Sequence, residues 1–260
     1  LLHDLRTVRD GPMTLRQPIE TLGRFSLFCW TFARCGLTRR PPAGKVFEEA
    51  YKIGVRSLPI LMIIAFFVGT NLTLQGKNAF EPIGGQNLVG MFVGLAGVRE
   101  LAPIIAAAMI AAKAGTEMAS QVAVMRSREQ IDAMEVMGIN PHWYLITPRF
   151  LGILLVMPAL TTLAIYGMLA SAYLVAVYQL GLNGAEFLDF VQSAARPRDL
   201  IVANIKSLFF GAVICMVCCY NGFYSKSGPK GVGSATNRAV VTAAVICVIL
   251  NYLISEIVYA

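Results

Sequence analysis

Two ionisable residues, Arg99 and Glu100, interrupt an otherwise uncharged stretch that runs from residue 88 to residue 112. A charge near the middle of a membrane costs about 2.5–3.5 kcal/mol unless it is paired or reached by water. Neighbouring residues on a helix point in different directions, so these two side chains cannot simply face each other. We expect either a polar patch on a substrate pathway or a structural ion pair that ties this segment to a neighbouring helix.

Signatures of other chemistry are missing from the sequence. It has no H-E-x-x-H, no G-x-S-x-G and no G-x-x-x-x-G-K-[ST] phosphate loop, and its only histidines are His3 and His142. Cys215 and Cys218 have the spacing of a redox or metal motif, but they lie in an apolar run, where cysteine acts as a small hydrophobic residue. We therefore expect no catalytic residue, no metal and no cofactor, and the energy for any work must come from a partner.

The composition places these residues in a membrane. The chain has 260 residues, of which 56% are hydrophobic and 14% are charged, and its mean hydropathy is +0.63. Soluble domains carry about 25% charged residues. The net charge of +7 would also suit nucleic acid, but the basic residues flank apolar runs, as they do in cytoplasmic loops of membrane proteins. We expect an integral membrane protein with no nucleic-acid partner.

The apolar runs predict an all-α integral membrane protein with five transmembrane helices. The predicted spans cover residues 58–75, 88–113, 150–178, 203–224 and 239–258. Residues 76–87 are expected to form a loop, and residues 184–200 a short amphipathic helix outside the membrane core. We divide the chain into a cytoplasmic N-terminal segment, residues 1–57, and a transmembrane domain, residues 58–260.

Two amphipathic stretches are too charged to span. Residues 18–37 predict either a helix that lies in the membrane interface or one that packs on protein. Residues 125–138 predict a short surface helix between two spans, in which charges alternate with an apolar edge formed by Ile131, Met134, Val136 and Met137. This helix is either a docking element, because exposed Met and Ile suit a protein interface, or a solvated connector.

The basic residues predict the orientation of the spans. They are concentrated before residue 57, between residues 113 and 149 and between residues 226 and 238, whereas the other side carries Lys77, Arg196, Arg198 and, at a span edge, Lys206. Because cytoplasmic loops collect Lys and Arg, we expect the N-terminus and residues 125–138 in the cytoplasm. An odd number of spans then leaves the C-terminus in the periplasm.

The stretch from Arg99 to Arg149 resembles the MlaE/YrbE permease family. It contains Arg-Glu-Leu-Ala-Pro at residues 99–103, Glu-Gln-Ile-Asp-Ala-Met-Glu-Val-Met-Gly-Ile-Asn-Pro at residues 129–141, and Pro148-Arg149. Asn221-Gly222 and residues 233–238 are also similar to that family, whereas Ala102 and Lys113 depart from it. The resemblance implies the membrane subunit of an ABC transporter that moves phospholipids or related lipids between the inner membrane and the outer envelope, which maintains the lipid asymmetry of the outer membrane.

The same resemblance implies a set of partners in the inner membrane. They are a second permease copy in a homodimer, a separate ABC ATPase that hydrolyses ATP, a periplasmic ring of MCE-domain proteins and, in some systems, a STAS-domain protein. Residues 18–37 would be the elbow helix of the family and residues 125–138 its coupling helix. ATP-driven closure of the ATPase would push two coupling helices together and squeeze a cavity lined by spans one, two and five.

Two sets of candidate site residues follow. The expected lipid cavity, with the headgroup near the charged pair, is lined by Arg99, Glu100, Asn71, Leu74, Gln75 and Asn251. The expected ATPase-coupling residues are Arg126, Arg128, Glu129, Asp132 and Glu135.

Two other functions stay open at this point. An ion-coupled secondary transporter would need an ion relay inside the membrane and usually an internal repeat, and the sequence displays neither. A non-transporting membrane scaffold would not need Arg99 and Glu100 at membrane depth. A stoichiometric ATPase partner, an ion-dependent flux, or partners without lipid would separate the three functions.

Overall fold

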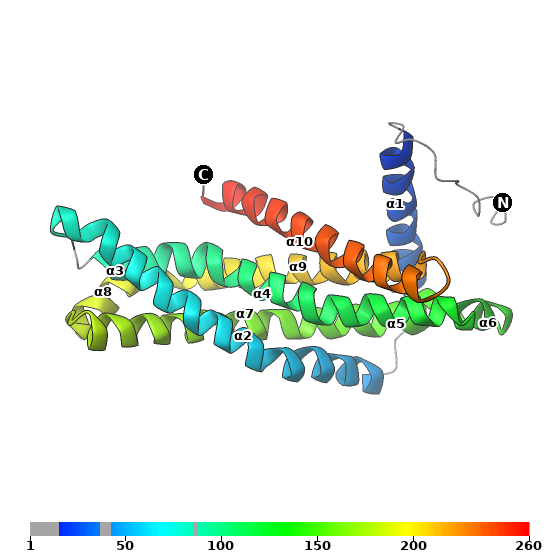
Figure 1. The fold of residues 1–260 in the computed structure, drawn as a ribbon, viewed down its shortest axis with the longest axis horizontal. Coiled ribbons are helices and arrows are strands. Elements are labelled where there is room, and N and C mark those ends of the chain that lie inside the picture. Colours follow the sequence, from blue (N-terminus) through cyan, green and yellow to red (C-terminus); the bar gives the residue numbers. More distant parts are fainter. Residues whose placement is uncertain (1–15, 37–42, 86–87, 260) are drawn as a thin grey trace.

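The computed structural model describes residues 16–36, 43–85 and 88–259, and within these ranges it contains helices and no strand. Five helices are long and apolar enough to cross a membrane: Ala43–Phe80, Leu88–Ser127, His142–Gln179, Pro197–Phe223 and Pro229–Tyr259. The predicted all-α architecture with five transmembrane helices is confirmed. In Figure 1 they form an elongated bundle, and helix α1 (Arg16–Gly36) lies across one end at a steep angle.

Three spans are single α-helices, and two combine α-helical with wider π-helical turns. The single helices are α2 (Ala43–Phe80), α9 (Pro197–Phe223) and α10 (Pro229–Tyr259). The second span is built from α3 (Leu88–Phe92), η2 (Val93–Leu101), α4 (Ala102–Ile110), η3 (Ala111–Gly115) and α5 (Thr116–Ser127). The third is built from η4 (His142–Ile146), α7 (Thr147–Leu174) and η5 (Val175–Gln179). Between spans lie η1 (Glu81–Ile83), α6 (Gln130–Val136) and α8 (Gly184–Ala194).

The helices extend beyond their predicted apolar cores. Helix α2 runs past residue 75, so residues 76–80 are helical and the predicted loop of residues 76–87 is too long by that much. It also passes residue 57, where we divided the chain, without a break. Hydropathy marks only the apolar part of a span, whereas a helix that leaves the membrane keeps its backbone hydrogen bonds in water.

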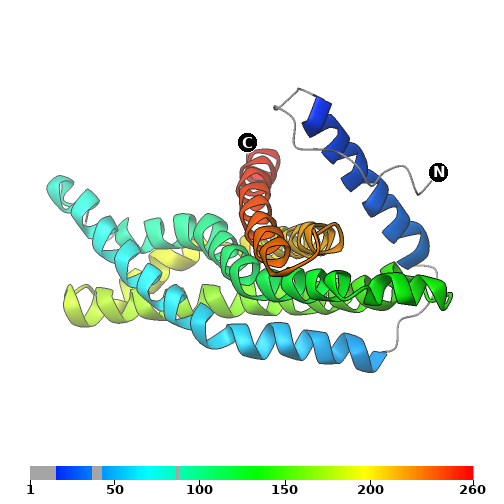
Figure 2. The same cartoon turned by 45° about the vertical axis from the view of Figure 1, so that its right-hand side comes forward.

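Helix α9 lies in the middle of the bundle and packs against α5, α7 and α10. Spans α2 and α7 approach each other closely at Gly69, which leaves no room for a side chain against Met168 and Ser171. Small residues of this kind let membrane helices approach closely. Helix α10 leans away from the other spans in Figures 1 and 2 and is the least buried of the five.

Three segments that carry many basic residues come together at one end of the bundle. Helix α1, the turn between α5 and α6, and the loop between α9 and α10 all lie at the same end in Figure 1. The backbone N–H of Gly228 in that loop donates to Ser127 Oγ at 3.0 Å. The predicted clustering of basic segments on one side is therefore present in the fold, and its assignment to the cytoplasm stays a prediction.

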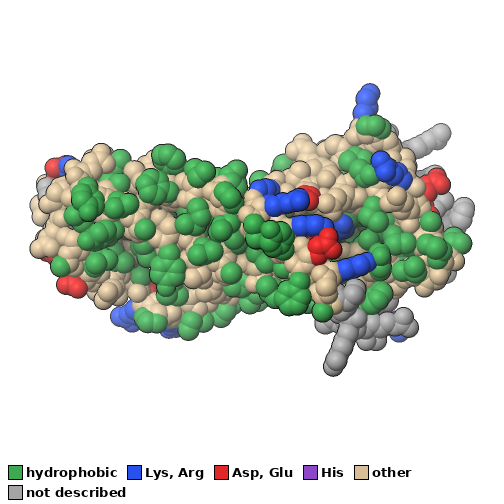
Figure 3. All heavy atoms as spheres, turned by 90° about the horizontal axis from the view of Figure 1, so that it is seen from below, with side chains coloured by type: hydrophobic (Ala, Val, Ile, Leu, Met, Phe, Trp, Pro, Cys, Tyr) green, Lys and Arg blue, Asp and Glu red, His purple; other side chains and the backbone are tan. Residues whose placement is uncertain are grey.

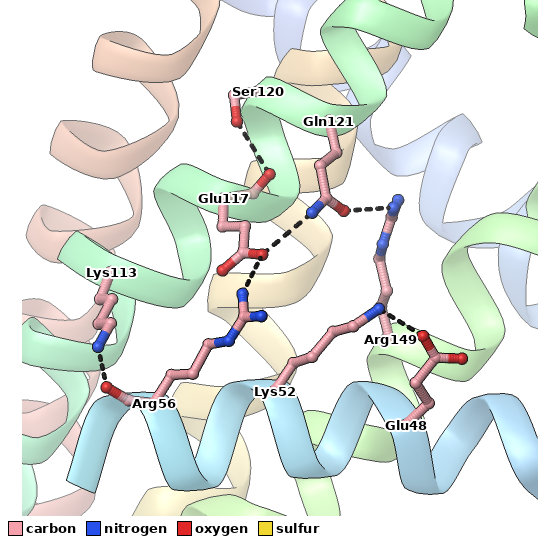
Figure 4. A network of polar contacts seen from close by, with 8 residues as sticks. All are labelled: Glu48, Lys52, Arg56, Lys113, Glu117, Ser120, Gln121 and Arg149. Carbon is pink, nitrogen blue, oxygen red and sulfur yellow. Dashed lines mark hydrogen bonds and ion pairs between the residues drawn. The ribbon is translucent and has the colours of Figure 1, made fainter.

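A polar network joins α2, α5 and α7 near this end (Figure 4). Arg56 Nη1 lies 3.5 Å from Glu117 Oε1, and Lys113 donates to the Arg56 carbonyl oxygen. Gln121 bridges the network, since it donates to Glu117 at 3.1 Å and accepts from Arg149 at 2.9 Å. On the face seen in Figure 3, acidic and basic side chains gather in one half of the molecule and apolar side chains dominate the rest.

Candidate functional site

The two charges of the second span meet two charges on α9. Arg99 Nη2 lies 3.1 Å from Asp199 Oδ2, and Lys206 Nζ lies 3.2 Å from Glu100 Oε1. Asp199 and Lys206 are seven residues apart, which places both on one face of α9. Two adjacent residues of the second span thus form ion pairs with two residues of α9 that are two helical turns apart.

A proline frees the backbone for this contact. Pro103 has no N–H and cannot donate the usual helical hydrogen bond to the carbonyl of Arg99. The helix widens into the π-helical segment η2 at this point, and Lys206 Nζ donates to the Arg99 carbonyl oxygen at 3.0 Å. The carbonyl that Pro103 leaves without its usual helical donor thus accepts a hydrogen bond from a buried ammonium group.

Helix α10 completes the cluster with two side chains one turn apart. Asn251 Nδ2 donates to Glu100 Oε2 at 2.7 Å, and Ser255 Oγ donates to Glu100 Oε1 at 2.6 Å. Lys206 Nζ also contacts Ser255 Oγ at 2.6 Å and Asn251 Oδ1 at 3.4 Å. Hydrogen bonds to both carboxylate oxygens tie the far half of α10 to the second span.

The Asp199 carboxylate also caps the start of α9. It accepts the backbone N–H of Arg196 at 3.0 Å and lies in the first turn of the helix, where a negative charge is stabilised by the helix dipole. The residue that compensates Arg99 is therefore held in place by the helix to which it belongs.

The cluster has an inner and an outer pair of charges, and its formal charge is zero. Lys206 and Asp199 have 0% and 3% of their side-chain surface exposed, whereas Arg99 and Glu100 have 27% and 38%. The guanidinium of Arg99 also lies 4.6 Å from the ring centroid of Tyr259, a cation–π distance. The ion-pair alternative is confirmed, because Arg99 and Glu100 are each paired with a residue of α9, and the substrate pathway stays a prediction.

The exposed side of the cluster faces a cavity of about 520 Å³ between the second span and α10. It combines the charged and polar groups with apolar and aromatic side chains. Its walls are formed by Leu95, Arg99, Glu100, Ile104, Val248, Asn251, Tyr252, Ser255, Glu256 and Tyr259. Such a cavity can hold a molecule with a polar and an apolar part at the same time.

The structure brings together three of the six expected cavity residues. Arg99, Glu100 and Asn251 line the cavity. Asn71 and Gln75 are exposed on α2 and hydrogen-bond to each other at 2.8 Å, and Leu74 beside them is half-buried. None of these three lines the cavity beside Glu100, and their contact with lipid stays a prediction.

Sequence reasoning missed the counter-charges. Lys206 was placed at a span edge on the outer side, but it is buried within α9. Asp199 and Ser255 were not singled out. The spacing of seven residues between Asp199 and Lys206 and of four between Asn251 and Ser255 is a detectable signal, since each spacing aligns polar groups on one face of an apolar helix.

The predicted surface helix of residues 125–138 is divided into two pieces. Helix α5 continues to Ser127, Glu129 adopts a left-handed backbone with φ 58°, and α6 begins at Gln130. Arg126 Nη1 pairs with Asp132 Oδ1 at 2.6 Å across this turn. Arg128, Glu129 and Glu135 remain exposed, so three of the five expected coupling residues are available to a partner.

The apolar edge of this helix differs from the expected one. Ile131 and Met134, which we expected to be exposed for docking, are buried against the chain itself. They anchor α6 to the end of the bundle. The exposed apolar side chains are Val136 and Met137, at 89% and 66%, and they lie beside Glu135.

Five long apolar helices, with a charge cluster between the second span, α9 and α10, define a multi-pass membrane protein. The sequence profile of the family described as Permease MlaE matches residues 46–257. A probable ABC transporter permease protein of Rickettsia conorii is 36% identical over 240 residues, and the match covers 92% of each chain. One from Synechocystis is 32% identical over 212 residues, with 82% of this chain and 81% of the relative covered. The chain belongs to the MlaE permease family and is an ABC transporter permease, as the resemblance predicted.

Another relative comes from a plant. The chloroplastic protein TRIGALACTOSYLDIACYLGLYCEROL 1 of Arabidopsis thaliana is 35% identical over 211 residues, which covers 80% of this chain and 60% of the longer relative.

Proposed function

We propose that this chain is the permease subunit of an ABC transporter that moves phospholipids or related lipids between the inner membrane and the outer envelope. The observation that carries the proposal is the cavity beside Arg99 and Glu100, where charge at membrane depth adjoins apolar walls. The family supports this function, and so does the plant relative whose name refers to a galactolipid. In Gram-negative cells the transport would maintain the lipid asymmetry of the outer membrane.

The lipid lies with its headgroup at Arg99 and Glu100 and its acyl chains along the apolar walls. Leu95, Ile104 and Val248 supply apolar surface on both sides of the cavity. Because the inner charges already neutralise the outer ones, a zwitterionic headgroup can enter without leaving a net charge uncompensated in the membrane.

A second copy of this chain covers the exposed side of α10. Its apolar stripe of Val241, Val245, Val248 and Tyr252 is unusually open for a span, and the charged cavity beside it also needs cover from lipid or protein. Two such faces enclose the lipid cavity between the copies. The homodimer places one α6 on each side for a separate ATPase subunit.

The resemblance to the family supports the remaining parts of the proposal. The end that carries α1 and α6 is cytoplasmic and docks the ATPase and, in some systems, a STAS-domain protein. The opposite end faces the periplasm with the C-terminus and contacts a ring of MCE-domain proteins. ATP-driven approach of the two α6 helices narrows the cavity and moves the lipid outward.

Lipid analysis of the purified protein tests the proposal. We expect gently solubilised wild-type protein to carry phospholipid detectable by mass spectrometry, and Arg99→Gln to carry less. Arg56→Gln is the matched control, because it removes a paired guanidinium that lies outside the cavity. Normal lipid occupancy in a folded Arg99→Gln variant would leave the ion cluster with a structural role only.

A further inference from the structure

A second cavity, of about 400 Å³, lies at the end of the bundle that carries the basic segments. It is enclosed by α1, the last turn of α9 and the first turns of α10, so three segments far apart in sequence contribute to it. Arg238 of this cavity and Asn251 of the central one are thirteen residues apart on α10, about 20 Å along a helix. The two cavities are therefore separate sites.

Basic side chains dominate the charged groups of this wall. Arg24 comes from α1, Lys226 from the α9–α10 loop and Arg238 from α10, and Glu20 is the one acidic lining residue. Among the described residues, neither Arg24 nor Arg238 lies within salt-bridge distance of a carboxylate. Two guanidinium groups on separate helices, neither of them paired with the single carboxylate of this wall, favour an anion in the space that they share.

Hydroxyl groups add neutral donors to this wall. The Ser225 oxygen is inaccessible to solvent and has no hydrogen-bond partner in the described part of the chain. A buried hydroxyl without a partner is unfavourable and indicates a missing water or ligand. Tyr220 and Tyr224 line the same cavity, and their rings pack together with a centroid distance of 5.0 Å.

The surroundings of the cavity suit the headgroup level of a membrane. Leu27 and Trp30 of α1 are exposed, whereas Phe28 of the same helix packs against Tyr220. Aromatic residues and arginines are enriched at the boundary between lipid and water, which is where phosphate groups of phospholipids lie. A phosphate at this level is within reach of guanidinium groups without crossing the apolar core.

We propose that this cavity binds the phosphate group of an anionic phospholipid of the adjacent leaflet, with Arg24 and Arg238 as its cationic clamp and Ser225 as a neutral donor. The site is independent of the central cavity and does not depend on transport. It fixes α1 against the α9–α10 hairpin when it is occupied. A free phosphate ion would use the same chemistry, and the test below distinguishes the two sources.

The test measures binding to the full chain in detergent micelles. The probes are dioctanoyl phosphatidylglycerol, its phosphatidylcholine counterpart and inorganic phosphate, each titrated at fixed ionic strength. We expect saturable binding of phosphatidylglycerol that weakens about tenfold in Arg24→Gln and in Arg238→Gln, the equivalent of about 1.4 kcal/mol for one charge-assisted contact. Lys230→Gln is the matched control, because it removes an exposed charge from the start of the same helix outside the cavity wall.

Each result has a defined meaning. Saturable binding of inorganic phosphate with the same dependence on Arg24 and Arg238 supports the site and assigns it to a soluble anion. Equal affinity of wild type and the Arg24→Gln/Arg238→Gln variant overturns the proposal, and so does an equal loss in Lys230→Gln, which indicates general attraction by positive charge. Arg238 is exposed, so Arg238→Gln carries the test if the α1 variant fails to fold. Lipid carried in the central cavity is measured separately and does not depend on this outcome.

Discussion

The ammonium group of Lys206 lies 3.2 Å from the carboxylate of Glu100, with none of its side-chain surface exposed, in the middle of a bundle of membrane helices. A lysine in such a place needs acceptors from the protein itself, because lipid provides none. It receives them from the second span and from α10, so the position of α10 depends on a charge carried by α9.

Removal of the Lys206 charge should leave Glu100 without its cation. We expect Lys206→Met to lower the stability by about 1–3 kcal/mol, less than for a fully buried pair because Glu100 is partly exposed. The measurement is thermal unfolding in detergent micelles. The double variant Lys206→Met/Glu100→Gln removes both charges and should be more stable than Lys206→Met alone. If the stability lost in the double variant equals the sum of the losses in Lys206→Met and in Glu100→Gln, the two residues do not interact.

The contact between α2 and α7 should tolerate no added methyl group. A Cβ at Gly69 would collide with the Met168 carbonyl and the Ser171 hydroxyl, so Gly69→Ala should cost about 1–3 kcal/mol. Gly233→Ala in α10 is the control, since a Cβ there meets nothing within 4 Å. This substitution should raise the stability by about 0.5–1 kcal/mol, because alanine loses less conformational freedom in a helix than glycine does. If Gly69→Ala and Gly233→Ala shift the melting temperature in the same direction, the close approach of α2 and α7 does not explain the effect of Gly69→Ala.

The turn between α5 and α6 stores strain at Glu129. A non-glycine residue with φ 58° is disfavoured by about 1 kcal/mol, so Glu129→Gly should leave the melting temperature unchanged or raise it. Glu135→Gly, in the helical part of α6, should lower it. Thermal unfolding measures both variants. If Glu129→Gly lowers the melting temperature, the contacts of the Glu129 side chain stabilise the protein by more than its backbone conformation destabilises it.

Charge reversal at Glu135 should uncouple ATP hydrolysis from lipid transfer without unfolding the protein. Glu135 is exposed beside Val136 and Met137, and the described chain gives it no ion-pair partner. We expect Glu135→Lys to reduce lipid transferred per ATP at least about tenfold in the reconstituted complex with its ATPase. Asp189→Lys, an exposed reversal on α8 at the other end of the bundle, should leave this ratio unchanged. Normal coupling in Glu135→Lys would exclude this face of α6 as the docking surface.

Much of this architecture is predictable from local patterns. Apolar length and periodicity depend on each stretch alone, so five spans, the surface helix after the second span and the short helix before α9 could all be found without tertiary information. The motif from Arg99 to Arg149 was sufficient to predict the family. Helix ends were less predictable, because a helix such as α2 continues beyond the membrane where hydropathy carries no signal.

By itself the sequence determined that Arg99 and Glu100 need compensation, since the free energy of a charge in a membrane depends on the residue and its depth. Only the tertiary structure decided which groups provide it, because Asp199, Lys206 and Ser255 reach the pair through the packing of α9 and α10 against η2. Tertiary packing also decided that Ile131 of α6 is buried and that Asn71 of α2 is exposed. A contact between residues about a hundred positions apart depends on how helices pack, and the sequence pattern of one helix does not specify which helices lie beside it.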